Sequence, residues 1–163
     1  MVKIILMDCD GVLTDGTYHY SEDGKTHKVF SAIDSKGITR GKRKGVYFAV
    51  ISEDPTGFNI NKARCKDLNV DYYKAANPED KLNIAKKIVA TKNCTLEDVA
   101  YIGDDIGDLH VLKSVGYPTS VSNATLPVKL LVEKRGGYRS NLQGGKGAVR
   151  EIIEYLLDLK QFN

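Results

Sequence analysis

The stretch Val2-Lys3-Ile4-Ile5-Leu6-Met7-Asp8-Cys9-Asp10-Gly11 decides the fold of this chain. Its first part, residues 2–7, is almost entirely apolar, as expected of a strand that is covered on both faces of its sheet. The apolar run ends at Asp8 and Asp10, and the Asp-Gly pair that follows is a common turn former. We therefore predict a buried first strand whose carboxyl end carries two acidic side chains.

The rest of the chain alternates short apolar segments with helical patterns, which is typical of an α/β protein with a parallel sheet. Further strands are predicted at 46–51, 70–73, 99–102 and 117–121, and helices at about 35–44, 59–68, 78–89, 106–115 and 149–157. Segments 17–20 and 28–30 flank a turn-like stretch and predict a β-hairpin. The predicted fold is one doubly wound, Rossmann-like domain over 1–163, with a parallel sheet of about five strands and a hairpin insertion.

The composition limits the location and the partners of the protein. The 163 residues carry 24 Lys and Arg against 21 Asp and Glu, and a net charge of +3 is too small to indicate nucleic acid binding. No apolar run approaches the roughly 20 residues of a membrane span. Cys9, Cys65 and Cys94 have neither a zinc spacing nor a disulfide pattern. We expect a cytoplasmic protein without nucleic acid or membrane partners.

Polar side chains occupy the predicted carboxyl ends of the strands, where ligands bind in open parallel sheets. They are Asp8 and Asp10 after the first strand, Ser52 after the second, Lys81 in the first turn of the helix after the third, and Asp104, Asp105 and Asp108 after the fourth. Each alone has a structural explanation, since Asp is common in turns and at helix starts. Their coincidence at successive strand ends predicts a single site.

The residue types in this site point to phosphoryl transfer. Several carboxylates around one point repel each other unless a cation neutralises them. Oxygen ligands without a nearby His or Cys favour a hard ion, of which Mg²⁺ is the natural choice. A carboxylate beside Mg²⁺, with a hydroxyl and a Lys to hold an anion, is what transfer through an aspartyl-phosphate requires. Asp8 and Asp10 lie two residues apart and share one side of an extended chain, so one can attack phosphorus while the other handles the leaving group's proton.

This constellation resembles the haloacid dehalogenase superfamily of phosphatases, whose first motif is Asp-x-Asp-Gly at the first strand. The resemblance implies that Asp8 is the nucleophile and that Asp10 is the general acid and base. It also implies that Ser52 and Lys81 bind the phosphate. The metal would be held by Asp8, by the main-chain carbonyl of Asp10 and by Asp104, with Asp105 and Asp108 as supporting carboxylates.

The chain has no room for the cap domain that most members of that superfamily carry. Residues 8–16, the hairpin, residues 34–38 and residues 144–151 resemble the phosphatases of 3-deoxy-D-manno-octulosonate 8-phosphate and of 9-phosphorylated nonulosonic acids. In those capless tetramers the hairpins form a central barrel, and a neighbour's C-terminal segment covers the active site. The resemblance implies a homotetramer with an assembly hairpin at about 17–30, and a Gly-rich lid and a helix at about 140–160.

The second motif departs from that group. Where the group usually has Thr-Gly-Arg or Thr-Gly-Glu, this chain has Ser52-Glu53-Asp54, which adds a carboxylate near the expected phosphate. Octulosonate phosphatases have Arg at the position of Asp54, whereas some nonulosonate phosphatases have an acid there. By this resemblance, Asp54 and the pair Asp34-Ser35 favour a nonulosonate substrate. We expect a Mg²⁺-dependent phosphatase of a small acidic sugar phosphate. The alternatives are a capless phosphatase of a macromolecular substrate and a non-catalytic domain of the same fold. A phospho-accepting receiver domain is disfavoured, because no Asp follows the third strand.

Overall fold

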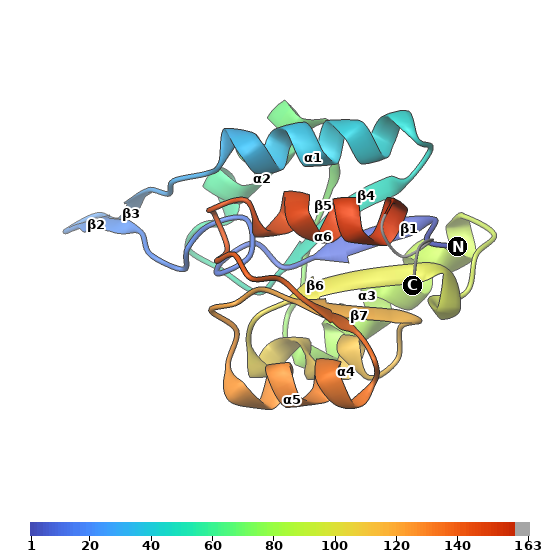
Figure 1. Ribbon diagram of the computed structural model, residues 1–163. Helices are drawn as coiled ribbons and strands as arrows, with labels where there is room; N and C mark the ends of the chain where they lie inside the picture. Colours follow the sequence, from blue (N-terminus) through green and yellow to red (C-terminus); the bar gives the residue numbers. More distant parts are fainter. Residues whose placement is uncertain (159–163) are drawn as a thin grey trace.

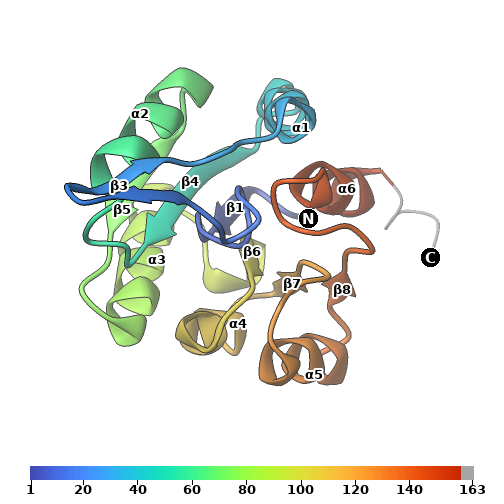
Figure 2. The same ribbon diagram turned by 90° about the vertical axis from the view of Figure 1, so that its left-hand side faces the viewer.

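The computed structural model describes residues 1–158 and forms an open parallel sheet between two layers of helices (Figure 1, Figure 2). Within these residues the sheet has six strands in the order β5-β4-β1-β6-β7-β8, and every neighbouring pair is parallel. The strands are β1 Ile4–Met7, β4 Tyr47–Ser52, β5 Asp71–Lys74, β6 Val99–Gly103, β7 Tyr117–Ser120 and β8 Tyr138–Arg139. The predicted doubly wound sheet is confirmed, with β8 as an additional strand of two residues.

Three helices cover each face of the sheet in the described part of the chain (Figure 2). The helices are α1 Ala32–Arg43, α2 Phe58–Leu68, α3 Pro78–Thr91, α4 Leu109–Leu112, α5 Leu126–Lys134 and α6 Ala148–Leu157. One layer contains α1, α2 and α6, and the other contains α3, α4 and α5. The single helix predicted at 106–115 is wrong in extent, because a 3₁₀ turn at Ile106–Asp108 precedes the short α4.

Side-chain caps set where two of the helices begin. The Ser31 hydroxyl accepts hydrogen bonds from the backbone N–H groups of Ile33 (3.1 Å) and Asp34 (3.4 Å), so α1 begins at Ala32 rather than at the predicted Ser35. The predicted Asn77 cap of α3 is present, since its side chain accepts from the Asp80 N–H at 2.9 Å. This cap starts α3 shortly after the end of β5, so that Pro78 and Lys81 in its first turn lie near the carboxyl edge of the sheet.

The core lies on both sides of the central strands, and α1 packs closely on α6. All four residues of β1 are buried, as expected of a strand between two helical layers. Gly37 allows the close approach of α1, because a Cβ there would lie 2.8 Å from the Arg150 Cα in α6. The buried Asp34 carboxylate accepts from the Arg150 N–H at 3.0 Å and from the Gly147 N–H at 3.4 Å. Asp34 thus holds the start of α6 against α1.

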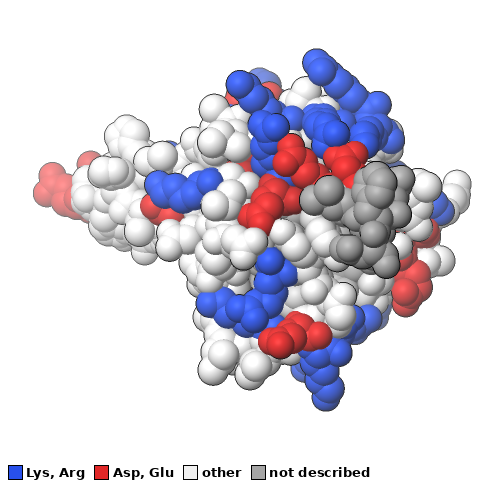
Figure 3. All heavy atoms as spheres, in the orientation of Figure 1, with Lys and Arg blue, Asp and Glu red and all other residues white. Residues whose placement is uncertain are grey.

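A hairpin of β2 (His19–Ser21) and β3 (Gly24–His27) projects from the body of the molecule (Figure 1). The predicted hairpin is confirmed, but residues 28–30 are not a strand and instead lead back toward α1. Figure 3 shows that most of the hairpin surface is neither acidic nor basic, apart from an acidic tip. The side chains of Tyr18, Tyr20 and Val29 are exposed on and beside it.

The described connections between the strands are too short to contain a further domain. Between β1 and β4 the chain forms only the hairpin and α1, and between α3 and β6 it forms one short 3₁₀ turn. The prediction that a cap domain is missing is therefore confirmed for the described residues. None of their helices has the length and apolar character needed to cross a membrane.

Candidate active site

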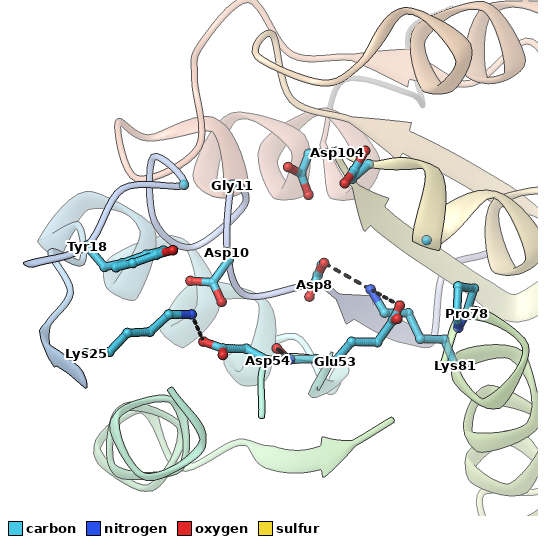
Figure 4. A pocket seen from close by; sticks show the side chains of 14 residues that line it. Asp8, Asp10, Gly11, Tyr18, Lys25, Glu53, Asp54, Pro78, Lys81 and Asp104 are labelled. Atoms are coloured by element: carbon cyan, nitrogen blue, oxygen red, sulfur yellow. Dashed lines mark hydrogen bonds and ion pairs between the residues drawn. The ribbon is translucent and has the colours of Figure 1, made fainter. Parts of the chain in front are cut away.

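One pocket lies at the carboxyl ends of β1, β4 and β6, beside the first turn of α3 (Figure 4). Its lining contains most of the side chains that the sequence placed at the strand ends: Asp8, Asp10, Ser52, Lys81, Asp104 and Asp105. It also contains Glu53 and Asp54 from the loop after β4, and Tyr18 and Lys25 from the hairpin. The parallel sheet thus brings together segments that lie far apart in the sequence.

Lys81 connects three of the carboxylates. Its Nζ lies 3.0 Å from Asp8 Oδ2, 2.9 Å from Asp108 Oδ1 and 3.4 Å from Glu53 Oε1, and its side chain is almost completely buried. Burial alone would favour neutral lysine, but the charges of Asp8 and Asp108 outweigh it and raise the pKa of Lys81 above its usual value. Lys81 therefore stays positive and faces the pocket beside Asp8.

Asp108 supports the site from below rather than lining the pocket. It is fully buried, and its Oδ1 accepts from Lys81 (2.9 Å) and from the Tyr101 hydroxyl (2.7 Å). Its Oδ2 accepts from the backbone N–H groups of Asp104 (2.9 Å) and Asp105 (3.2 Å). These four bonds hold the loop after β6 in place. The Asp105 carboxylate instead accepts from the Ile106 N–H at the surface, so the two predicted supporting carboxylates have different environments.

Asp8 and Asp104 form the part of the site that fits a cation. Carboxylate oxygens of Asp8, Asp104 and Asp108 lie within 4.8 Å of one another. Burial and repulsion from Asp108 raise the pKa of Asp8 to about 7, and burial with repulsion from Asp8 and Asp108 raises that of Asp104 to about 8. Asp104 Oδ1 is buried without a hydrogen-bond partner. A hard divalent cation would satisfy this oxygen and relieve the repulsion.

The loop after β4 sends its three side chains in different directions. The buried Ser52 hydroxyl accepts from the Asp54 N–H at 3.2 Å and lies at the pocket wall. Glu53 points into the pocket toward Lys81, whereas Asp54 points toward the hairpin (Figure 4). Asp54 forms ion pairs with Lys25 at 2.8 Å and with Lys28 at 2.7 Å. Of the two acids, Glu53 is therefore the one that lies beside Lys81 and the expected phosphate position.

The hairpin supplies residues that sequence reasoning missed. Lys28 Nζ lies 2.7 Å from the Asp10 carboxylate and 2.9 Å from Asn61 Oδ1, as well as contacting Asp54. In the sequence, Lys28 is one of two lysines that follow the hairpin turn, and Asn61 lies within a polar helix. The only sequence signal for Lys28 is its place just after the predicted hairpin turn, where the chain leads back to the body of the protein.

Close backbone contacts fix the loop that carries Asp10. Gly11 has φ +83°, and a Cβ there would lie 2.0 Å from Asp104 Oδ2, so this position requires glycine. The Gly11 carbonyl accepts from Asn123 Nδ2 at 2.9 Å, and Asn123 Oδ1 accepts from the Gly144 N–H at 2.7 Å. The predicted lid segment thus contacts the loop that carries Asp10 in its own chain. That it covers a neighbour's site stays a prediction.

The chain is similar to known phosphatases in sequence. The sequence pattern of haloacid dehalogenase-like hydrolases matches residues 75–141. The 3-deoxy-D-manno-octulosonate 8-phosphate phosphatase KdsC of Yersinia pestis is 31% identical over 156 residues, which cover 96% of this chain and 80% of that protein. KdsC of Escherichia coli K12 is 29% identical, with 96% of this chain and 79% of that protein covered.

The chain is also similar to solved structures of phosphatases. The cobalt-bound deoxy-D-mannose-octulosonate 8-phosphate phosphatase of Haemophilus influenzae has a TM-score of 0.86 and 31% identity, covering 98% of this chain and 90% of that one. The 3-deoxy-D-manno-octulosonate 8-phosphate phosphatase of Moraxella catarrhalis, in complex with magnesium, phosphate and KDO, has a TM-score of 0.86 and 28% identity, covering 99% and 94%.

An open parallel sheet with Asp-x-Asp-Gly after its central strand, a buried Lys and a second acidic loop defines a haloacid dehalogenase-like hydrolase. The relatives named above, which are about 30% identical over most of both chains, are all phosphatases, which narrows this class of hydrolases to the phosphatases. The chain belongs to the family of phosphatases that includes KdsC of Yersinia pestis. The sequence-based expectation of a phosphatase is confirmed, which leaves its substrate, its metal and the roles of its residues to be assigned.

Proposed function

We propose that the chain is a Mg²⁺-dependent phosphatase of a small acidic sugar phosphate of the octulosonate 8-phosphate or nonulosonate 9-phosphate type. The position of Asp8 between Lys81 and Asp104 carries the proposal. On one side the Asp8 carboxylate forms an ion pair with the Lys81 ammonium group, and on the other it lies near Asp104, whose buried Oδ1 has no hydrogen-bond partner and could ligate a metal ion. The names of the relatives support the substrate class, and the magnesium and phosphate in the Moraxella catarrhalis complex support the chemistry.

Asp8, Asp104 and the main-chain carbonyl of Asp10 would hold the ion. When bound, Mg²⁺ would lower the repulsion between the carboxylates and withdraw negative charge from the transferring phosphoryl group. Asp108 would orient the site rather than ligate, because Lys81, Tyr101 and two backbone N–H groups already use its oxygens.

The side chains divide the reaction into two balanced steps. An oxygen of Asp8 attacks phosphorus, the bond from phosphorus to the sugar oxygen breaks, and Asp10 gives that oxygen a proton. Asp10 then takes a proton from water, whose oxygen attacks phosphorus and breaks its bond to Asp8. Inorganic phosphate leaves and both carboxyl groups return to their starting states. Lys81 and Ser52 would hydrogen-bond the phosphoryl oxygens through both steps.

The surroundings of Asp54 bear on which sugar is used. Its ion pairs with Lys25 and Lys28 neutralise the acid that favoured a nonulosonate from the sequence. The curated relatives named above are octulosonate 8-phosphate phosphatases. We therefore place octulosonate 8-phosphate first among the candidate substrates.

The test is phosphate release from a panel of phosphate esters, with Mg²⁺ and with EDTA. The panel contains octulosonate 8-phosphate, nonulosonate 9-phosphates, hexose phosphates and a phosphopeptide. Among the esters of this panel, we expect release from an ulosonate phosphate only, and only with the metal. Preferred release from the phosphopeptide would favour a macromolecular substrate, and absence of release from every ester would contradict the proposal.

A further inference from the structure

Lys28 is a buried cation that the reaction proposed above does not use. It follows β3, and its side chain has no exposed surface. Its Nζ lies between three oxygen acceptors, at 2.7 Å from the Asp10 carboxylate, 2.7 Å from Asp54 Oδ2 and 2.9 Å from Asn61 Oδ1. A buried ammonium group is costly unless it is paired, and these three bonds use all of its protons.

The acceptors come from three different segments. Asp10 lies after β1, Asp54 lies after β4, and Asn61 belongs to α2. Lys28 therefore links the base of the hairpin to the loop that carries the proposed general acid. Asp8, by contrast, is held by Lys81 from the other side of the pocket. Each member of the Asp-x-Asp pair thus has its own buried lysine.

Asp54 is itself rigidly held, so it can fix the position of Lys28. Asp54 Oδ1 accepts from the backbone N–H groups of Thr56 (3.1 Å) and Gly57 (3.0 Å), while Oδ2 faces both lysines. A Cβ on Gly57 would lie 2.1 Å from Asp54 Oδ2, which shows how closely the loop wraps this carboxylate. Asp54, the third residue of the second motif, thus anchors Lys28.

We propose that Lys28 is a positioning residue that holds the Asp10 carboxyl group in line with the leaving oxygen, with Asp54 and Asn61 fixing the ammonium group. This inference rests on the proposed function, in which Asp10 protonates the sugar oxygen. The hairpin then has a second role, because its base determines the geometry of proton transfer in its own subunit. A purely structural lysine would attach the hairpin to the body without this effect.

The two roles differ in how the loss of Lys28 depends on the leaving group. A sugar alkoxide is a poor leaving group and needs the proton from Asp10, whereas 4-nitrophenolate leaves without one. Misplacing a catalytic group by about 1 Å can cost about a hundredfold in rate. In Lys28→Met we expect kcat/KM for octulosonate 8-phosphate to fall at least about tenfold further than kcat/KM for 4-nitrophenyl phosphate.

Two further variants separate positioning from general damage. Lys42→Met removes a lysine outside the pocket, which donates to the carbonyls of Leu68 and Asn69, and should change both substrates by the same factor. Asp10→Asn should show the same selective loss as Lys28→Met. Adding Lys28→Met to Asp10→Asn should then cost little more selectivity, because both changes act through one group.

The outcomes distinguish this inference from the proposed function. Equal losses for both substrates in a Lys28→Met protein with the wild-type circular dichroism spectrum would overturn the positioning role. Lack of wild-type activity on sugar phosphates would instead reject the proposed function. If Lys28→Met does not fold, Lys28→Arg keeps the charge but changes its geometry, and the same selective loss is expected from it.

Discussion

Asp8 is the residue on which turnover depends in the proposed reaction. We predict that Asp8→Asn lowers phosphate release to below about one thousandth of the wild-type rate, because an amide cannot form the phosphorylated intermediate. The fold should persist, since an Asn oxygen can still accept from the Cys9 N–H (2.7 Å in the wild type) and Lys81 keeps Asp108. Thermal unfolding gives the control, and wild-type turnover in a folded variant would contradict the mechanism.

In the proposed reaction, Glu53 would compete with phosphate for Lys81. Its carboxylate lies 3.4 Å from Lys81 Nζ, at the wall where the phosphoryl oxygens would bind. We predict that Glu53→Gly strengthens inhibition by inorganic phosphate about tenfold, equivalent to about 1.4 kcal/mol. Glu53→Gln is the matched control: an equal gain would identify the charge as the cause, and a gain in the Gly variant alone would identify the size. Weaker inhibition in both variants would show that Glu53 supports phosphate binding.

The site residues that the sequence predicted are those that directly follow an apolar strand or begin a capped helix. Lys28 and Asn61 could not be predicted in this way. Their contacts span 18 and 33 residues and depend on where the hairpin returns to the body. The sequence could not separate the roles of Asp105 and Asp108, because both are acids in the same loop. The 3₁₀ turn at Ile106–Asp108 directs the Asp108 side chain inward, whereas the Asp105 side chain caps the turn at the surface.

At the scale of elements, Asp34 joins α1 to the start of α6. Its buried carboxylate accepts from the Gly147 and Arg150 N–H groups, which would otherwise lack partners at the helix terminus. We predict that Asp34→Ala lowers the free energy of unfolding by about 2 kcal/mol. Denaturant unfolding measures this. Ser31→Ala, which removes the more exposed cap of α1, should cost less, and an equal or smaller loss for Asp34→Ala would contradict this role.

The elements that the sequence predicted well are those with strong apolar patterns and clear boundaries. The run Ile4–Met7 has only apolar residues, which predicts a strand buried on both faces, and all four residues are buried. The missed elements lack such signals: β8 has two residues, and α5 contains Pro127 and exposes Leu126 and Leu130, which obscures its apolar face. Tertiary contacts rather than local pattern define these two elements.

At the scale of the whole molecule, the projecting hairpin supports the predicted homotetramer. It exposes Tyr18 (46%), Tyr20 (67%) and Val29 (61%) on a largely uncharged surface (Figure 3). Clustered exposed apolar groups of this kind mark interaction surfaces. We predict that light scattering gives a mass four times 18.0 kDa. A Tyr20→Lys/Val29→Lys variant should give smaller species, and a monomeric wild type would contradict the assembly.

The two raised carboxyl pKa values make the stability of the protein depend on metal and pH together. Without metal, Asp8 and Asp104 have pKa values of about 7 and about 8, against about 3.9 in an unfolded chain. The folded protein therefore binds more protons than the unfolded chain between about pH 4 and pH 8, and this contribution to the free energy of unfolding falls as the pH rises through that window. A divalent cation favours the charged carboxylates and opposes this loss.

We predict that Mg²⁺ raises the Tm more at pH 8 than at pH 6, because at pH 6 the ion must first displace protons from the site. Thermal unfolding at both pH values, in Mg²⁺ and in EDTA, measures the difference. Asp104→Asn removes the group with the higher pKa and should reduce both the response to Mg²⁺ and the fall in stability with pH in EDTA. An equal rise in Tm at the two pH values would show that protons and metal do not compete for Asp8 and Asp104, and the metal would then have to bind elsewhere.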